Sequence, residues 1–218
     1  MTAYNSPKIL SQAGFTLVEM MVALVIAMLG MSAILIAHMG QNQSYTTQLQ
    51  TAGARQKARA TIAMLRADLL MANQFIAAGP ATITFHRIGA PPGINVTYQW
   101  MGNGNGAPVL LRRDDGAPPQ QPDNVFADGI DGIEFFYQFK NAPPANQVNA
   151  AQLGDITSVT ISMVSRANGP DPHFQDRDIY RTASRTDWDN ETLNNGPLND
   201  NFHRRFWQET VACRNMGQ

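Results

Sequence analysis

An unbroken apolar segment near the amino terminus constrains this chain most. Residues 20–37 read MMVALVIAMLGMSAILIA without a charge, and residues 15–18 extend this segment upstream with only Glu19 intervening. About 20 apolar residues in a helix span the hydrocarbon core of a bilayer. A secretory signal would have a shorter apolar stretch, followed by a small-residue cleavage site that does not follow here. We therefore expect the segment to stay in the mature protein as a membrane helix.

The charges around the apolar segment suggest its orientation and raise a question about Glu19. Lys8 is the one cation before the segment, and the next Lys or Arg is Arg55. Positive residues favour the cytoplasmic side, so the amino terminus is expected in the cytoplasm. Glu19 stands inside the apolar segment, where a carboxylate costs about 2.5 to 3.5 kcal/mol at mid-bilayer. Either Glu19 lies among the headgroups and complements the positive end of the helix, or its charge has a partner.

The helical pattern continues well beyond the apolar segment. No proline occurs between Pro7 and Pro80. The spacing predicts one helix from about residue 15 to about residue 78, ended by Gly79-Pro80. Its outer half carries an apolar stripe that is expected to face the protein core. The stripe consists of Ala58, Ile62, Leu65, Leu69, Ala72 and Ile76.

The pattern alternates after Pro80, as is typical of strands bounded by Gly, Pro, Asn and Asp turns. The predicted strands are residues 82–88, 94–101, 108–113, 132–139 and 156–167. Residues 168–201 have few aliphatic side chains and are expected to form a long, loosely ordered loop with one strand near 179–183. The fold class is therefore α+β, with the outer half of a long amino-terminal helix packed on an antiparallel β-sheet head.

Composition and motifs give no support for catalysis or metal binding. The 218 residues include one cysteine, Cys213, and four scattered histidines without metal-ligand spacing. The pairs Asp114-Asp115 and Asp128/Asp131 lie beside glycines, where aspartate favours turns by bonding the backbone. Residues 170–178 hold the most metal-like cluster, but their spacing fits no calcium loop, and a solvated loop explains them better. We expect no catalytic residue, no metal and no cofactor.

Three short clusters of cations raise the possibility of nucleic-acid binding. They lie at residues 55–59, 112–113 and 204–205, and aromatic side chains flank the last of them. Such a mixture can bind DNA. Sixteen basic and seventeen acidic residues give a net charge of −1, which favours pairing of these cations with local acids. We therefore do not expect DNA as a partner.

The junction GFTLVE at residues 14–19 resembles the signature of type IV prepilins and type II secretion pseudopilins. The resemblance implies that a prepilin peptidase cleaves between Gly14 and Phe15 and that the new amino-terminal Phe15 is N-methylated. It also implies that Glu19 of one subunit neutralises the terminal amine of a neighbour within a filament. The charge pairing agrees with physics, because a low-dielectric helix bundle strengthens an ion pair between the two groups.

Two further stretches resemble the minor pilins called PilW. Residues 42–73 resemble the region after the membrane helix, including the Arg-x-Asp-Leu segment at 66–69, and residues 202–215 resemble the closing strand. Cys213 departs from the aliphatic residue expected in that strand, and a small buried apolar side chain is predicted there. The resemblance implies a minor pilin that acts in pilus assembly or tip priming and contacts other minor and major pilins.

These expectations divide the chain into four parts. They are a leader peptide at 1–14, the membrane and filament-core half of the helix at 15–40, its amphipathic half at 41–79, and a β-rich periplasmic head at 80–218. The protein is expected in the inner membrane with its head in the periplasm, and later in the pilus. One alternative is a type II secretion pseudopilin of the J kind. Another, from a different class, is a membrane-tethered periplasmic enzyme or binding domain.

Overall fold

A long helix followed by antiparallel strands forms the fold, as the α+β prediction stated. The computed structural model describes residues 16–102, 108–115, 124–172, 174–188 and 201–214. In chain order the elements are α1 (Leu17–Leu70), β1 (Ala72–Ala78), β2 (Thr82–Arg87), β3 (Asn95–Met101), β4 (Val109–Asp114), β5 (Asn124–Asp128), β6 (Ile130–Phe139), the 3-10 helix η1 (Ala150–Asp155), β7 (Ile156–Arg166), β8 (Tyr180–Arg181), β9 (Asp187–Trp188) and β10 (Arg204–Ala212). The chain divides into two compact units, residues 1–46 and 47–218.

The helix α1 ends at Leu70, eight residues before the predicted end. The amide of Met71 donates to the carbonyl of Asp68 at 3.1 Å, and the chain then enters β1. A continued helix would have buried Ile76 on its apolar stripe. The strand instead buries Phe75, which packs edge-on against Phe85 with ring centroids 6.1 Å apart, and leaves Ile76 44% exposed. Pairing with β2 overrides the local helical pattern, because tertiary packing outweighs propensity.

The strands of residues 47–218 form two larger sheets, where the sequence predicted one. A five-stranded sheet has the order β1-β2-β3-β4-β5, a three-stranded sheet has the order β10-β7-β6, and β8 pairs with β9. All pairings are antiparallel. Five predicted strands appear within two residues of their expected limits, whereas β1, β5 and β9 were not predicted.

A glycine carries the chain from the first sheet into the second. Gly129 lies between β5 and β6 with φ +65°, a left-handed conformation that glycine adopts without steric cost. Its amide donates to the carbonyl of Pro108 at 3.0 Å, and its carbonyl accepts from the amide of Arg166 at 2.9 Å. The turn therefore bonds to both sheets at once.

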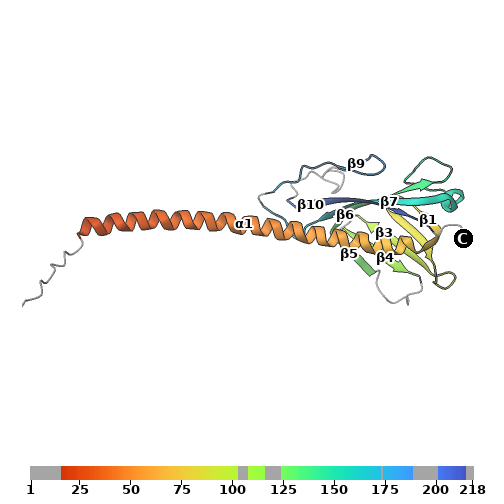
Figure 1. The fold of residues 1–218 in the computed structure, drawn as a ribbon, viewed down its shortest axis with the longest axis horizontal. Helices are drawn as coiled ribbons and strands as arrows, with labels where there is room; N and C mark the ends of the chain where they lie inside the picture. Colours follow the sequence, from red (N-terminus) through yellow and green to blue (C-terminus); the bar gives the residue numbers. More distant parts are fainter. Residues whose placement is uncertain (1–15, 103–107, 116–123, 173, 189–200, 215–218) are drawn as a thin grey trace, which may run out of the picture. The chain divides into compact units, whose positions relative to one another are not determined.

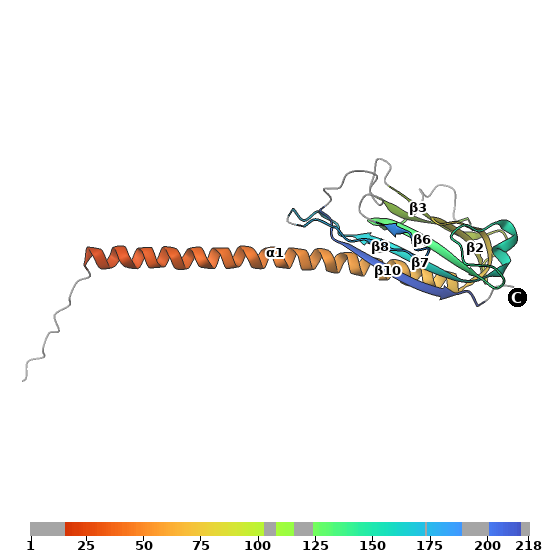
Figure 2. The same cartoon turned by 90° about the horizontal axis from the view of Figure 1, so that it is seen from above.

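The later part of α1 packs against both sheets. In Figure 1, β10 lies on one side of this part of the helix and β4 and β5 lie on the other, and Figure 2 shows β10 alongside it in a second view. Four members of the predicted stripe, Ala58, Ile62, Leu65 and Leu69, are buried on α1. They join the core formed by the inner side chains of both sheets. The predicted core-facing role of this stripe is confirmed over residues 58–69.

The acidic side chain of Asp68 anchors the end of α1 to the five-stranded sheet. Its carboxylate accepts a hydrogen bond of 2.7 Å from the Tyr98 hydroxyl and one of 3.0 Å from the Arg112 guanidinium, and it lies 3.3 Å from Arg87. Burial and the Asp68 carboxylate raise the pKa of Tyr98, so the hydroxyl remains a donor. On the other side of the helix, Arg66 lies 3.1 Å from Glu209 of β10. The Arg-x-Asp-Leu segment thus joins α1 to both sheets.

The predicted loop at 168–201 is more ordered than expected where the structure describes it. Residues 180–181 and 187–188 form a short hairpin, which includes the strand expected near 179–183. Tyr180 is buried and stacks on Phe206 of β10, with centroids 6.0 Å apart. The loop is therefore fastened to the three-stranded sheet through an aromatic contact that its polar composition did not indicate.

Candidate functional site

The start of α1 is capped by two reciprocal hydrogen bonds between Thr16 and Glu19. The Glu19 amide donates to Thr16 Oγ1 at 3.2 Å, and the Thr16 amide donates to Glu19 Oε2 at 3.3 Å. This is a capping box, in which each side chain satisfies a backbone donor that the helix leaves unpaired. The Thr-x-x-Glu pattern of residues 16–19 is the sequence signal for this capping box, and the predicted helix start at about residue 15 did not include it. Thr16 is thus a residue of the site that sequence reasoning missed.

The capping box bears on the two interpretations of Glu19. Its carboxylate is exposed and lies in the first turn of α1, where a negative charge complements the positive end of the helix. This geometry is the one expected from the simpler interpretation. A cationic partner for Glu19 is not among the described residues. Gly14 and Phe15, the predicted cleavage and methylation residues, lie outside the described residues.

The first part of α1 presents apolar side chains on every side. Large hydrophobic residues from Leu17 to Met39 are 53 to 76% exposed. None of the most apolar 18-residue window is buried within the chain, and α1 is long and apolar enough to cross a membrane. Exposed apolar surface of this extent requires a second medium, either lipid or other helices, because contact with water is unfavourable. Residues 17–39 of α1 are therefore the candidate interaction site.

Buried ion pairs hold the head together at positions that the sequence assigned to turns and to a solvated loop. Arg204 of β10 donates to Asp131 at 2.6 Å and to Asp176 at 3.2 Å, and all three side chains are inaccessible to solvent or nearly so. Asp176 also accepts from the Tyr180 hydroxyl at 3.0 Å. The turn interpretation of Asp131 and the solvated-loop interpretation of Asp176 are both wrong. Both carboxylates are structural partners of one arginine.

Other acidic residues of the candidate metal-binding and turn motifs also have protein partners. Asp128 lies 2.9 Å from Lys57, whose ammonium group lowers the pKa of this carboxyl. Asp171 accepts from the Thr47 hydroxyl at 3.0 Å and lies 3.0 Å from His203, whose ring stacks on Phe174. These contacts tie the loop before β8 to the segment before β10. Within the part of the chain that the structure describes, no three His, Cys, Asp or Glu residues cluster for a metal.

The members of the predicted cationic clusters make different contacts. Lys57, Arg112 and Arg204 form ion pairs, as the near-neutral net charge suggested. Arg59 instead lies over the ring of Trp207, 5.6 Å from its centroid.

Cys213 is buried, as predicted, and burial raises the pKa of its thiol to about 12.

A comparison with known protein families agrees with the amino-terminal motif. The family described as the prokaryotic N-terminal methylation motif matches residues 9–35. Among solved structures, the type IV-like pilin TTHA1219 from Thermus thermophilus is similar with a TM-score of 0.44 and 13% identity, covering 75% of this chain and 98% of that one. No curated protein matches the chain. The amino-terminal segment, from the residues before the predicted cleavage site into the first turns of α1, therefore carries a prokaryotic N-terminal methylation motif.

Proposed function

We propose that this chain is a type IV pilin-like structural subunit, specifically a minor pilin similar to PilW that acts in pilus assembly or tip priming. One observation carries the proposal. A methylation motif at residues 9–35 leads directly into a helix whose apolar side chains are exposed on all sides. A helix of this kind satisfies its backbone internally but leaves its surface to be covered by lipid or by other helices. A filament subunit uses both environments in turn.

The proposed mechanism is assembly. A prepilin peptidase cleaves the bond between Gly14 and Phe15, and Phe15 then bears the methylated terminal amine. Residues 15–40 first span the inner membrane and then pack against the equivalent helices of other pilins. Close packing of apolar surfaces replaces the lipid contacts, and Glu19 meets the positive amine of a neighbouring subunit. Residues 80–218 form the periplasmic head, which reaches the cell surface with the pilus.

The contacts of the head support a structural role. Of the carboxylates that the sequence offered as catalytic pairs, Asp128 is engaged by Lys57 and Asp131 by Arg204. The Cys213 thiol is buried and its pKa is raised by burial, which opposes formation of a nucleophilic thiolate. These observations favour a subunit over the membrane-tethered enzyme.

Processing of the leader tests this proposal. We expect co-expression with a prepilin peptidase to shorten the full chain by residues 1–14, with a mass increase of one methyl group on the mature chain. Intact-mass spectrometry measures both changes. Gly14→Val should block cleavage because a branched side chain hinders close approach of the peptidase to the backbone. The matched change Gly40→Val lies far from the junction and should be cleaved like the wild type. An uncleaved wild-type chain in the presence of active peptidase would refute the proposal.

A further inference from the structure

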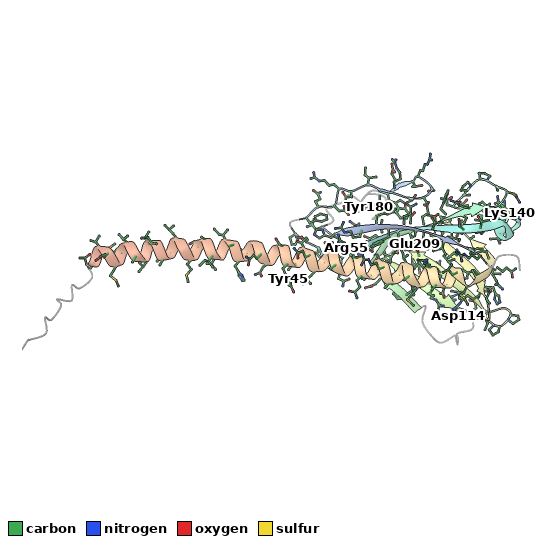
Figure 3. The ribbon with its side chains drawn as sticks, viewed as in Figure 1. Tyr45, Arg55, Asp114, Lys140, Tyr180 and Glu209 are labelled. Carbon is green, nitrogen blue, oxygen red and sulfur yellow. The ribbon has the colours of Figure 1, made fainter. Side chains whose placement is uncertain are left out.

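A groove of about 630 Å³ runs along α1 beside β10. It is lined by Thr47, Gln48, Thr51, Ala52, Arg55, Gln56, Arg59 and Arg205. The lining residues on α1 recur every four positions, with 47, 51, 55 and 59 in one row and 48, 52 and 56 in the next. They therefore share one face of the helix over about three turns. Figure 3 shows Arg55 on this stretch of α1, next to β10. The lining therefore contains three arginines, several hydroxyls and amides, and no acidic side chain.

The contacts between β10 and α1 explain why two of these arginines have no acidic partner among the described residues. Residues 205, 207 and 209 share one face of β10 because strand side chains alternate. Trp207 lies under Arg59, and Glu209 pairs with Arg66. The third of these residues, Arg205, borders the same groove as Arg55. Among the described residues no acid forms an ion pair with either guanidinium.

Both free arginines are exposed, and they approach the groove from two different elements. Two like charges that border one groove repel each other, and an anion between them removes this repulsion. A guanidinium binds a carboxylate through two parallel hydrogen bonds. The Thr51 hydroxyl and the side-chain amides of Gln48 and Gln56, which also line the groove, can donate additional hydrogen bonds. The groove is thus complementary to a short anionic segment.

We propose that this groove binds an acidic segment of a partner protein, with carboxylates seated at Arg55 and Arg205. A nucleic acid fits less well, because it presents a negative charge at every nucleotide and its binding proteins offer an extended row of cations. Here Arg59 is engaged by Trp207, and the next cation along the same face, Arg66, is already neutralised by Glu209. The net charge of −1 also supplies no attraction at long range. This inference does not depend on the proposed processing of the leader.

Binding of a labelled hexaglutamate peptide to the full chain in a nonionic detergent tests the proposal by fluorescence anisotropy. We expect saturable binding that weakens as salt is added. The double variant Arg55→Gln and Arg205→Gln should weaken it by about tenfold, since two charge-assisted contacts are lost. A control, Arg177→Gln with Arg214→Gln, removes the same charge from exposed positions outside the groove and should bind like the wild type. Each single groove variant should fall between these two.

Three results would overturn the proposal. The first is equal binding of hexaglutamate by the groove double variant and the control. The second is binding of hexaglutamine as tight as that of hexaglutamate, which would remove the role of charge. The third is binding of single-stranded decathymidylate, dependent on Arg55 and Arg205, that is tighter than binding of hexaglutamate, because it would assign the groove to nucleic acid. Far-UV circular dichroism of each variant confirms that the fold is retained, as is expected for exposed side chains.

Discussion

Replacement of Arg204 by methionine should destabilise the head more than any exposed substitution. The Arg204 guanidinium lies 2.6 Å from Asp131 and 3.2 Å from Asp176, with side-chain exposures of 0, 0 and 2%. Methionine fills a similar volume but leaves two buried carboxylates without this cation. Breaking a buried ion pair by removal of one partner costs about 3 to 5 kcal/mol. A folded domain is stable by only about 5 to 15 kcal/mol, so much of the stability should be lost.

Urea unfolding of the full chain in detergent, followed by tryptophan fluorescence, measures this loss. For a unit of this size each kcal/mol lowers Tm by about 2 to 4 °C, so thermal unfolding should shift by about 6 to 20 °C. Arg181→Met is a matched control, because it breaks the exposed Arg181–Asp187 pair, with contacts of 2.8 and 3.2 Å. This control should leave the unfolding midpoint unchanged.

A triple variant separates the cost of unpaired charge from the cost of lost packing. Arg204→Met combined with Asp131→Asn and Asp176→Asn leaves no buried carboxylate in the cluster, although Arg166 then loses its contact of 3.5 Å with Asp131. If unpaired charge is the main cost, the triple variant should be more stable than Arg204→Met alone. A loss below about 1 kcal/mol for Arg204→Met, or no recovery in the triple variant, would refute this reasoning.

Two further predictions concern the core. Leu65→Ala should lower the free energy of unfolding by about 2 to 5 kcal/mol because Leu65 is fully buried, whereas the neighbouring Met64→Ala, at an exposed position, should have little effect on urea unfolding. Cys213 should resist alkylation by iodoacetamide in the native chain at pH 8, since a thiol pKa of about 12 leaves only about one molecule in ten thousand as thiolate. Unfolding in urea should make the Cys213 thiol reactive. Fast labelling of the native chain would contradict the buried position.

Strands with strong alternation and clear turn signals could be predicted from the sequence. The segments predicted at 132–139 and 156–167 correspond to β6 (Ile130–Phe139) and β7 (Ile156–Arg166). The strand ANQFIAA at β1 was missed because alanine and polar residues give it no alternation, and its apolar residues also fit a helical stripe. β5 was missed because it has only five residues. Local pattern therefore fails where pairing with a neighbouring strand supplies most of the stabilisation.

The amino-terminal methylation motif could be recognised from the sequence, whereas the buried charges of the β-sheet part could not be predicted. Residues 14–19 lie next to one another in the sequence, so their spacing alone indicates a function. Arg204 and Asp131 are 73 positions apart, and no periodicity relates them. In the sequence, Arg204 and Arg205 form one cationic pair. In the structure they point to opposite faces of β10, Arg204 toward buried aspartates and Arg205 toward the groove. The fold, through strand alternation, gives these adjacent arginines different roles.

The capping box makes the proposed role of Glu19 testable by a single isosteric change. Glutamine serves at this position of a capping box as well as glutamate, so Glu19→Gln retains the contacts with Thr16 and removes only the charge. Thr16→Val does the converse, because it removes the cap, at a cost of about 0.5 to 2 kcal/mol to the helix start, and keeps the charge. If Glu19 pairs with a neighbouring amine, Glu19→Gln should be cleaved and inserted in the membrane but absent from sheared pili, whereas Thr16→Val should still be incorporated. The opposite pattern on immunoblots of pili would assign Glu19 to capping alone and would remove charge pairing from the proposed mechanism.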